Sequence, residues 1–107
     1  MKYSIDRFQT DIDECIKLCM EELFRRKNGI SGESTIEQLE NVILPELEML
    51  LQKIRTGDLP IKSDRYLNSF ANAFRVWGWD MEVPTELFVK LTQINNNFRD
   101  ISRVPHP

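Results

Sequence analysis

Histidine is nearly absent from this chain of 107 residues, since the one copy, His106, stands second from the C-terminus. Chain ends are usually mobile, whereas a catalytic imidazole must be held in place. Nucleophilic catalysis that depends on a histidine base is therefore not expected. Glycine is also scarce, and its four scattered copies form neither a G-x-x-x-x-G-K nor a G-x-G-x-x-G phosphate-binding motif.

The chain has two cysteines, and their spacing does not fit a metal site. Cys15 and Cys19 lie four residues apart in a helical pattern, so they share one helix face in an orientation that is poor for a disulfide. A structural zinc ion needs four ligands, and no C-x-x-C pair or Glu-x-x-His motif supplies the others. We predict two small core side chains, no metal and no cofactor. Free thiols also indicate a reducing compartment, the cytoplasm.

Long hydrophobic runs and an export signal are missing as well. The longest apolar runs, such as residues 42–44, are far shorter than the ~18 residues that a membrane span needs. The first seven residues, MKYSIDR, carry charges where a secretory signal needs an apolar stretch. We therefore expect a soluble protein without membrane contact.

The composition is that of one soluble domain, with 41% hydrophobic and 29% charged residues, and we expect residues 1–107 to form it. Seventeen acidic residues against fourteen basic ones give a formal net charge of −3. Nucleic-acid binders are usually basic, so we do not expect nucleic acid as a partner. No Asp or Glu falls on a predicted core stripe, where burial would tune it for acid–base work, and we predict that the chain is not an enzyme.

Four segments repeat apolar residues at steps of three and four, the period of an amphipathic helix. The first three segments cover residues 4–28, 34–56 and 63–78. The fourth begins at residue 84 or 85 and ends near residue 101. Pro45 interrupts the second segment, where we expect a kink or a break. Short connections make sequence neighbours pack antiparallel, so we predict an all-α, antiparallel four-helix bundle with residues 100–107 as a flexible tail. The alternative is a three-helix core with the first helix leaning outside as a dimer arm.

The ends of the predicted helices carry local signals. Ser4 or Thr10 fits an N-cap of the first helix, and Gly29 suits a left-handed C-cap. Ser34 followed by Glu37 forms a capping-box pattern. The predicted core combines the apolar stripes of the four segments: Phe8, Ile12, Ile16, Leu39, Ile43, Leu47, Phe70, Phe74, Trp77, Leu91, Ile94 and Phe98.

Acid is concentrated between residues 28 and 52, where five glutamates stand and Lys and Arg are missing. On an ideal helix, three of these glutamates and two leucines fall within about 80° of one another. This predicted acidic strip comprises Glu37, Glu40, Leu44, Glu48 and Leu51. Leucine anchors and steering carboxylates together suit a basic partner protein, provided that Pro45 leaves the helical phase intact. The alternative is that both leucines pack against a neighbouring helix and the glutamates are solvated.

A second unusual feature is Trp79, which follows Gly78 in a predicted loop. Tryptophan is common at interface hot spots, and Asp80 and Glu82 beside it add acid to the same end of the bundle, so all three are candidate protein-binding residues. The alternative is that Trp79 folds back as a lid over the bundle end, with its indole N–H bonded to a carbonyl.

Three other functions stay open. Basic residues gather with Tyr66 around the third segment, which would suit a nucleic-acid-linked regulator, although interleaved aspartates favour a solvated face. These basic residues are Lys53, Arg55, Lys62, Arg65 and Arg75. A small-molecule sensor would hold a ligand between helices near Tyr66, Phe74 and Trp77. A structural module would homodimerise through its long first helix.

In size, charge and helical content the chain resembles the four-helix immunity proteins of nuclease bacteriocins. The resemblance lies in architecture: no motif is shared, the paired tyrosines of that family's interface are absent, and no site residue carries over. It implies a bacterial immunity or antitoxin protein that occludes a basic, nuclease-like toxin. Glutamates suit such a task because they imitate the phosphates that a nuclease surface attracts.

Overall fold

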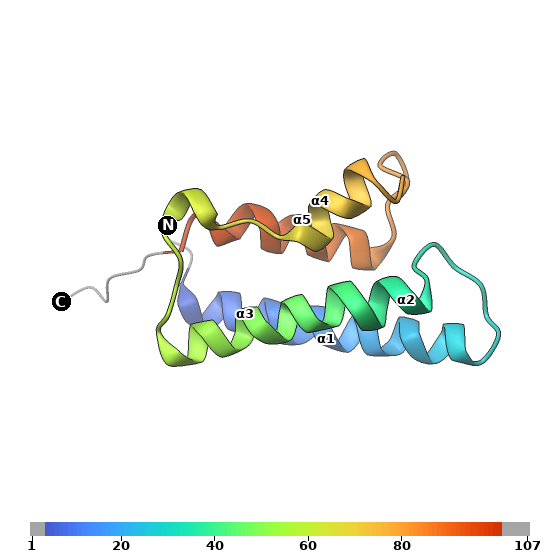
Figure 1. The fold of residues 1–107 in the computed structure, drawn as a ribbon, viewed down its shortest axis with the longest axis horizontal. Helices are drawn as coiled ribbons and strands as arrows, with labels where there is room; N and C mark the ends of the chain where they lie inside the picture. Colours follow the sequence, from blue (N-terminus) through green and yellow to red (C-terminus); the bar gives the residue numbers. More distant parts are fainter. Residues whose placement is uncertain (1–3, 102–107) are drawn as a thin grey trace.

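The chain is all-helical, as predicted. A computed structural model describes residues 4–101, and within that range it contains four α-helices of at least eight residues, several shorter turns and no β-strand (Figure 1).

Helix α1 (Ile5–Lys27) matches the predicted first helix at both ends. The Ser4 hydroxyl accepts the backbone N–H of Arg7 at 3.1 Å, which satisfies one of the free donors of the first turn. After Lys27 the chain turns at Gly29, whose φ of 80° is costly for residues with a side chain. The Ile30 N–H then bonds back to the Arg25 carbonyl at 2.9 Å and closes the helix end.

The second predicted helix is present as an unbroken helical run of three labelled parts: α2 (Ile36–Gln38), the π-helical turn η1 (Leu39–Ile43) and α3 (Leu44–Thr56). Of the two outcomes predicted at Pro45, a kink or a break, the break does not occur, because the chain stays helical from Ile36 to Thr56. Proline has no N–H to donate to the preceding turn. The widened turn lies just before it, where the Leu44 N–H bonds to the Leu39 carbonyl five residues back.

The capping box that opens this run stands one residue later than predicted. Thr35, not Ser34, is the N-cap: its hydroxyl accepts the Gln38 N–H at 3.1 Å, and the Gln38 side chain accepts the Thr35 N–H at 3.0 Å. Ser34 is buried and binds Arg26 instead.

The predicted third helix, residues 63–78, is shorter in the structure. A 3-10 turn, η2 (Lys62–Asp64), is followed by an extended stretch, and α4 covers only Asn68–Arg75. Because Trp77 lies beyond the end of α4, its side chain leaves the predicted stripe. The last helix, α5 (Glu86–Phe98), begins at Thr85, whose hydroxyl accepts the Phe88 N–H at 3.2 Å, one of the two starts that the sequence allows.

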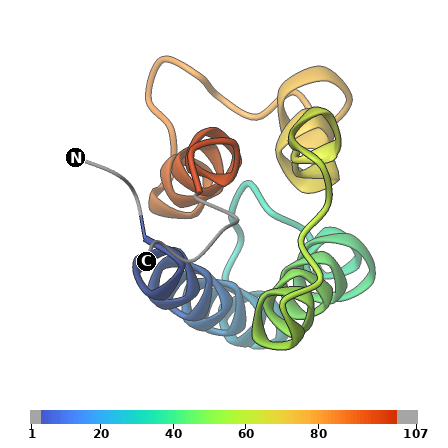
Figure 2. The same cartoon turned by 90° about the vertical axis from the view of Figure 1, so that its left-hand side faces the viewer.

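The helices lie in two layers. Along the long axis the chain passes through α1, comes back through α2, η1 and α3, and then repeats this path through α4 and α5 (Figure 1). Figure 2, viewed from the left-hand end of Figure 1, shows α4 and α5 above α3 and α1. Helix α1 packs against both α3 and α5, and α4 packs against α5.

The core differs from the predicted one mainly around α4. Phe74 is 45% exposed, and Ile16, Phe70 and Trp77 are only partly buried at the edge of the core. The other eight predicted core residues are buried. The core also contains Cys15 and Cys19 and further side chains that come chiefly from α1, α3, α5 and the loops: Leu23, Leu44, Leu50, Leu51, Ile54, Leu59, Leu67, Ala73, Trp79, Leu87, Phe88 and Ile101.

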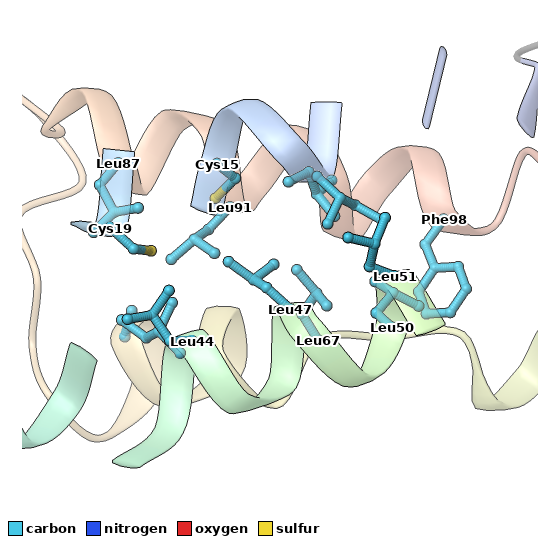
Figure 3. Packing of buried hydrophobic residues seen from close by; sticks show 14 of the residues in the cluster. Cys15, Cys19, Leu44, Leu47, Leu50, Leu51, Leu67, Leu87, Leu91 and Phe98 are labelled. Carbon is cyan, nitrogen blue, oxygen red and sulfur yellow. The ribbon is translucent and has the colours of Figure 1, made fainter. Parts of the chain in front are cut away.

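Figure 3 shows how α3 supplies this core, with Leu44, Leu47 and Leu51 directed toward the side where Leu91 and Cys19 lie. The stripe of α3 is wider than predicted, because residues on two adjacent rows of the helix are buried. The two cysteines are free and buried, as predicted.

Ile101, which the prediction assigned to the tail, packs in the core. Ile101 is buried, and its carbonyl accepts a hydrogen bond from Nη1 of Arg65 at 2.9 Å. The rest of the predicted tail, residues 102–107, which includes His106, lies outside the described residues.

Candidate protein-binding surfaces

The predicted acidic strip loses its two apolar members. Leu44 is 7% exposed and Leu51 is 8% exposed, so both side chains belong to the core and neither is a surface anchor. The reason is the position of α3 between its neighbours, which buries both rows of leucines on that helix. The glutamates Glu37, Glu40 and Glu48 remain at or near the surface.

Three of the five glutamates between residues 28 and 52 have partners within the fold. Glu33 accepts the Asp80 N–H at 2.7 Å, and Glu40 pairs with Lys27 at 3.1 Å. Glu46 accepts two backbone N–H groups at the start of α4. Within residues 4–101, Glu37 and Glu48 therefore carry the unpaired charge of the strip.

Trp79 is a core residue rather than a surface anchor. It is 5% exposed, its ring meets Phe88 edge-on at 5.5 Å between centroids, and it contacts Trp77 at the same distance. Its burial matches the predicted lid, but the predicted hydrogen bond is missing: the indole N–H has no partner among the described residues. A sequence in which an aromatic residue follows a glycine turn is compatible with both roles, a buried lid and an exposed anchor.

The loop that carries Trp79 is fixed by acidic side chains. The Asp80 carboxylate accepts the backbone N–H groups of Glu82 and Val83 at 2.9 and 3.2 Å. The Asp80 N–H is in turn bound by Glu33 from the loop between α1 and α2. The candidate residues Asp80 and Glu82 are thus exposed, as expected, but the Asp80 carboxylate shapes its own loop.

Between α4, this loop and the first turns of α5 lies a groove of about 260 Å³, which we call the apolar groove. Its lining is largely hydrophobic and comes from one aromatic of α4, two loop residues and one face of α5: Phe70, Met81, Pro84, Phe88, Val89, Thr92 and Gln93. Met81 and Val89 are exposed on its surface. The sequence pattern does not predict this groove, because the groove depends on the short length of α4.

The segment that follows α4 and runs into the first turn of α5 carries charge of one sign. Between Arg75 and Lys90 there are three carboxylates, Asp80, Glu82 and Glu86, and no Lys or Arg. Lys90 is directed to α1, where its ammonium nitrogen lies 3.9 Å from Asp11 and 3.5 Å from Glu14.

Asp11 itself is partly shielded from solvent at the contact between α1 and α5. Burial raises the pKa of its carboxyl above the ordinary value, the Lys90 ammonium acts in the opposite direction, and the Glu14 charge adds to the increase. The ion pair between Asp11 and Lys90 therefore links α1 to α5, although it holds the Asp11 carboxylate partly out of water.

The predicted basic face lacks one of its members. Arg65 is buried, and its guanidinium donates to the carbonyls of Pro60 and Ile101, both at 2.9 Å, so it is a clamp between two chain segments. The side chains proposed to line a small-molecule pocket are also separated. Tyr66 lines a hollow of about 270 Å³ beside α3, and neither Phe74 nor Trp77 contributes to it.

No cluster of three or more His, Cys, Asp or Glu side chains among residues 4–101 is arranged to hold a metal ion. The helices of this part of the chain are also too short or too polar to cross a membrane. No protein-family model matches the chain, and no curated protein or solved structure shows a significant similarity to it.

Proposed function

We propose that this chain is a non-enzymatic, cytoplasmic protein-binding module whose partner is a basic protein. Within that class we propose an immunity or antitoxin role, in which the chain neutralises a nuclease-like toxin by covering its basic surface. The scaffold for this task is a single domain, which we interpret as an antiparallel four-helix bundle with a shortened third helix.

One observation carries the proposal. The apolar groove lies beside a chain segment, residues 76–89, whose charged side chains are all acidic. Apolar side chains that enter a groove supply most of the affinity of an interface. Carboxylates at the rim increase the association rate with a positively charged partner and repel acidic ones. Glu82 lies in the loop that supplies Met81 and Pro84 to the groove and has no ion-pair partner among residues 4–101, so its charge is available to a partner.

The groove is also held in shape before binding. Glu46 fixes the start of α4, Asp80 fixes the loop, and Glu33 ties that loop to the connection between α1 and α2. A preformed surface loses little conformational entropy when a partner binds, so more of the contact energy appears as affinity.

The test begins by capturing the partner with the wild-type chain from an extract of the cells that produce it. The captured protein is then purified, and its nuclease activity is measured with and without one equivalent of the chain. We expect a basic protein whose activity is lost on binding. An acidic partner, or a nuclease that stays fully active in the complex, would contradict the proposal.

Two matched pairs of variants locate the interface on that partner. Met81→Lys in the groove is compared with Met49→Lys on α3, because both methionines are more than half exposed. Glu82→Lys is compared with Glu48→Lys in the predicted strip, because both glutamates are exposed. We expect Met81→Lys to accelerate dissociation and Glu82→Lys to slow association, each about ten-fold or more, with the two controls unchanged. Loss of binding by Glu48→Lys alone would move the site to the strip.

A further inference from the structure

A second surface on α1 is apolar and exposed, and the proposed function does not use it. Phe24 is 70% exposed, and Met20, one helical turn before it, is 54% exposed. Ile30 of the following loop is exposed to a similar extent. These side chains line a shallow hollow of about 520 Å³ together with three charged residues: Lys17, Glu21 and Arg25. We call this set of six residues the α1 ledge.

The ledge is accessible because of its place in the fold. Figure 1 shows the last turns of α1 and the connection to α2 extending beyond α4, α5 and the loop between them. The upper layer of helices therefore does not cover the last turns of α1, and a large partner can approach them, whereas Lys17 and Glu21 also border a hollow beside α5.

The ledge is also rigid. The Arg26 guanidinium donates to the Ser34 carbonyl at 2.7 Å and pairs with Glu22 at 2.9 Å, which holds the loop against α1. The Ile30 N–H bonds to the Arg25 carbonyl. Exposed apolar side chains on a rigid support are typical of an interaction site, because their contacts form without ordering a flexible segment.

The charges on the ledge indicate which partner fits. Lys17, Glu21 and Arg25 alternate in sign along one face of α1. In a two-fold antiparallel pair residue i of one copy faces residue j of the other and the reverse, so Glu21 can face Arg25 of the second copy twice, while Lys17 falls outside this pairing. The apolar groove, with carboxylates alone between Arg75 and Lys90, would instead repel a second copy of itself.

We propose that the α1 ledge binds a second copy of this chain. The two α1 helices cross in opposite directions about a two-fold axis that passes between Met20 and Arg25. Met20 of one copy then packs against Phe24 of the other, and Glu21 faces the Arg25 of the other copy twice, once on each side of the axis. Arg25 is available because its contact with Glu22 is long, at 3.6 Å, and its side chain is half exposed.

The interface is small, so we expect a weak dimer that depends on concentration. Sedimentation velocity on the full chain, from roughly 1 µM to 1 mM, measures this association directly. Met20→Lys should weaken the dimer at least ten-fold, whereas the matched variant Met49→Lys on α3 should leave it unchanged. A wild-type chain that stays monomeric throughout, or a dimer that Met20→Lys does not weaken, would overturn the proposal.

Charge reversal gives a second test that does not depend on packing. Glu21→Arg places arginine opposite arginine, and Arg25→Glu places glutamate opposite glutamate, so each variant alone should be monomeric. When the two variants are mixed, arginines of one chain face glutamates of the other, and a heterodimer should form. Failure of the mixture to associate, under conditions where the wild type dimerises, would also overturn the proposal.

Both charged positions are exposed on a helix, and circular dichroism verifies that the variants keep their helical content. The experiment uses the chain alone, so its outcome is independent of the basic partner.

Discussion

Glu46 on α3 accepts the backbone N–H of Ser69 at 2.7 Å and the Ser69 hydroxyl at 2.6 Å. Its second oxygen accepts the Asn68 N–H at 2.6 Å. A side chain of one helix thus serves as the N-terminal cap of another, and a negative charge stands where the helix dipole favours it. This contact sets the start of α4, and the position of α4 in turn forms one wall of the apolar groove.

Replacement of Glu46 by alanine should destabilise the fold by about 1–2 kcal/mol, because two backbone donors and the buried Ser69 hydroxyl lose their acceptor. Glu46→Gln keeps one acceptor oxygen and should cost less. Urea unfolding measures both free energies. Glu48→Ala, an exposed position on the same helix, is the control, and an equal loss from Glu46→Ala and Glu48→Ala would contradict the capping role.

Gly32 should be intolerant of a side chain because of Arg26. A Cβ atom at residue 32 would collide with the Arg26 guanidinium, which holds the loop through Ser34 and Glu22. Gly32→Ala should therefore cost about 1–2 kcal/mol of unfolding free energy, as the arginine gives up its contacts.

A double-mutant cycle separates this collision from other effects of alanine. If the cost arises from the displaced guanidinium, Gly32→Ala should cost almost nothing once Arg26 is replaced by alanine. Equal costs in both backgrounds would show that Arg26 is not the cause. Ser31→Ala, one position earlier in the same exposed loop, controls for a general effect of loop substitution.

The two cysteines should be inert in the folded protein. Both are buried, and the hydrogen bond between the Cys15 and Cys19 thiols, together with burial, raises the pKa of Cys15. Since the thiolate is the reactive form, a thiol-reactive disulfide reagent should modify the native chain at least about 10³-fold more slowly than the urea-unfolded chain. Comparable rates in the two states would show that this part of the core opens readily.

Asp11 should make the stability depend on pH. Because burial raises its folded-state pKa, the fold favours the protonated carboxyl. The stabilisation is complete below the ordinary Asp pKa and is lost as the pH rises through the raised one. The stability of Asp11→Asn relative to wild type should therefore increase with pH across this acidic window and then level off, in unfolding experiments. Asp13→Asn, at an exposed position, is the control, and a flat or falling difference for Asp11→Asn would contradict the account.

The sequence was sufficient for α1 because all of its signals are local. The Ser4 cap, the apolar spacing and the turn at Gly29 lie within the helix and its flanking residues. The capping box of the second helix was displaced by one residue, because Ser34 and Thr35 are both good N-caps and each is followed three residues later by Glu or Gln. The two residues differ in the folded chain because Arg26 donates hydrogen bonds to the Ser34 carbonyl and hydroxyl.

Local sequence patterns could not predict the length of α4 or the burial of the two leucines of the predicted strip. The start of α4 is set by Glu46, which precedes Ser69 by 23 residues. The burial of Leu44 and Leu51 depends on which helices flank α3, and helical spacing alone gave them an exposed position. The apolar groove likewise requires three segments that only the folded chain brings together.

The most direct measurement of the central claim is hydrogen exchange of the chain with and without its captured basic partner. Docking in the apolar groove predicts slower exchange at the amides of residues 76–90 and little change along residues 36–56. Protection confined to residues 36–56, or no protection in either segment, would contradict the proposal that the groove and its carboxylates bind the partner.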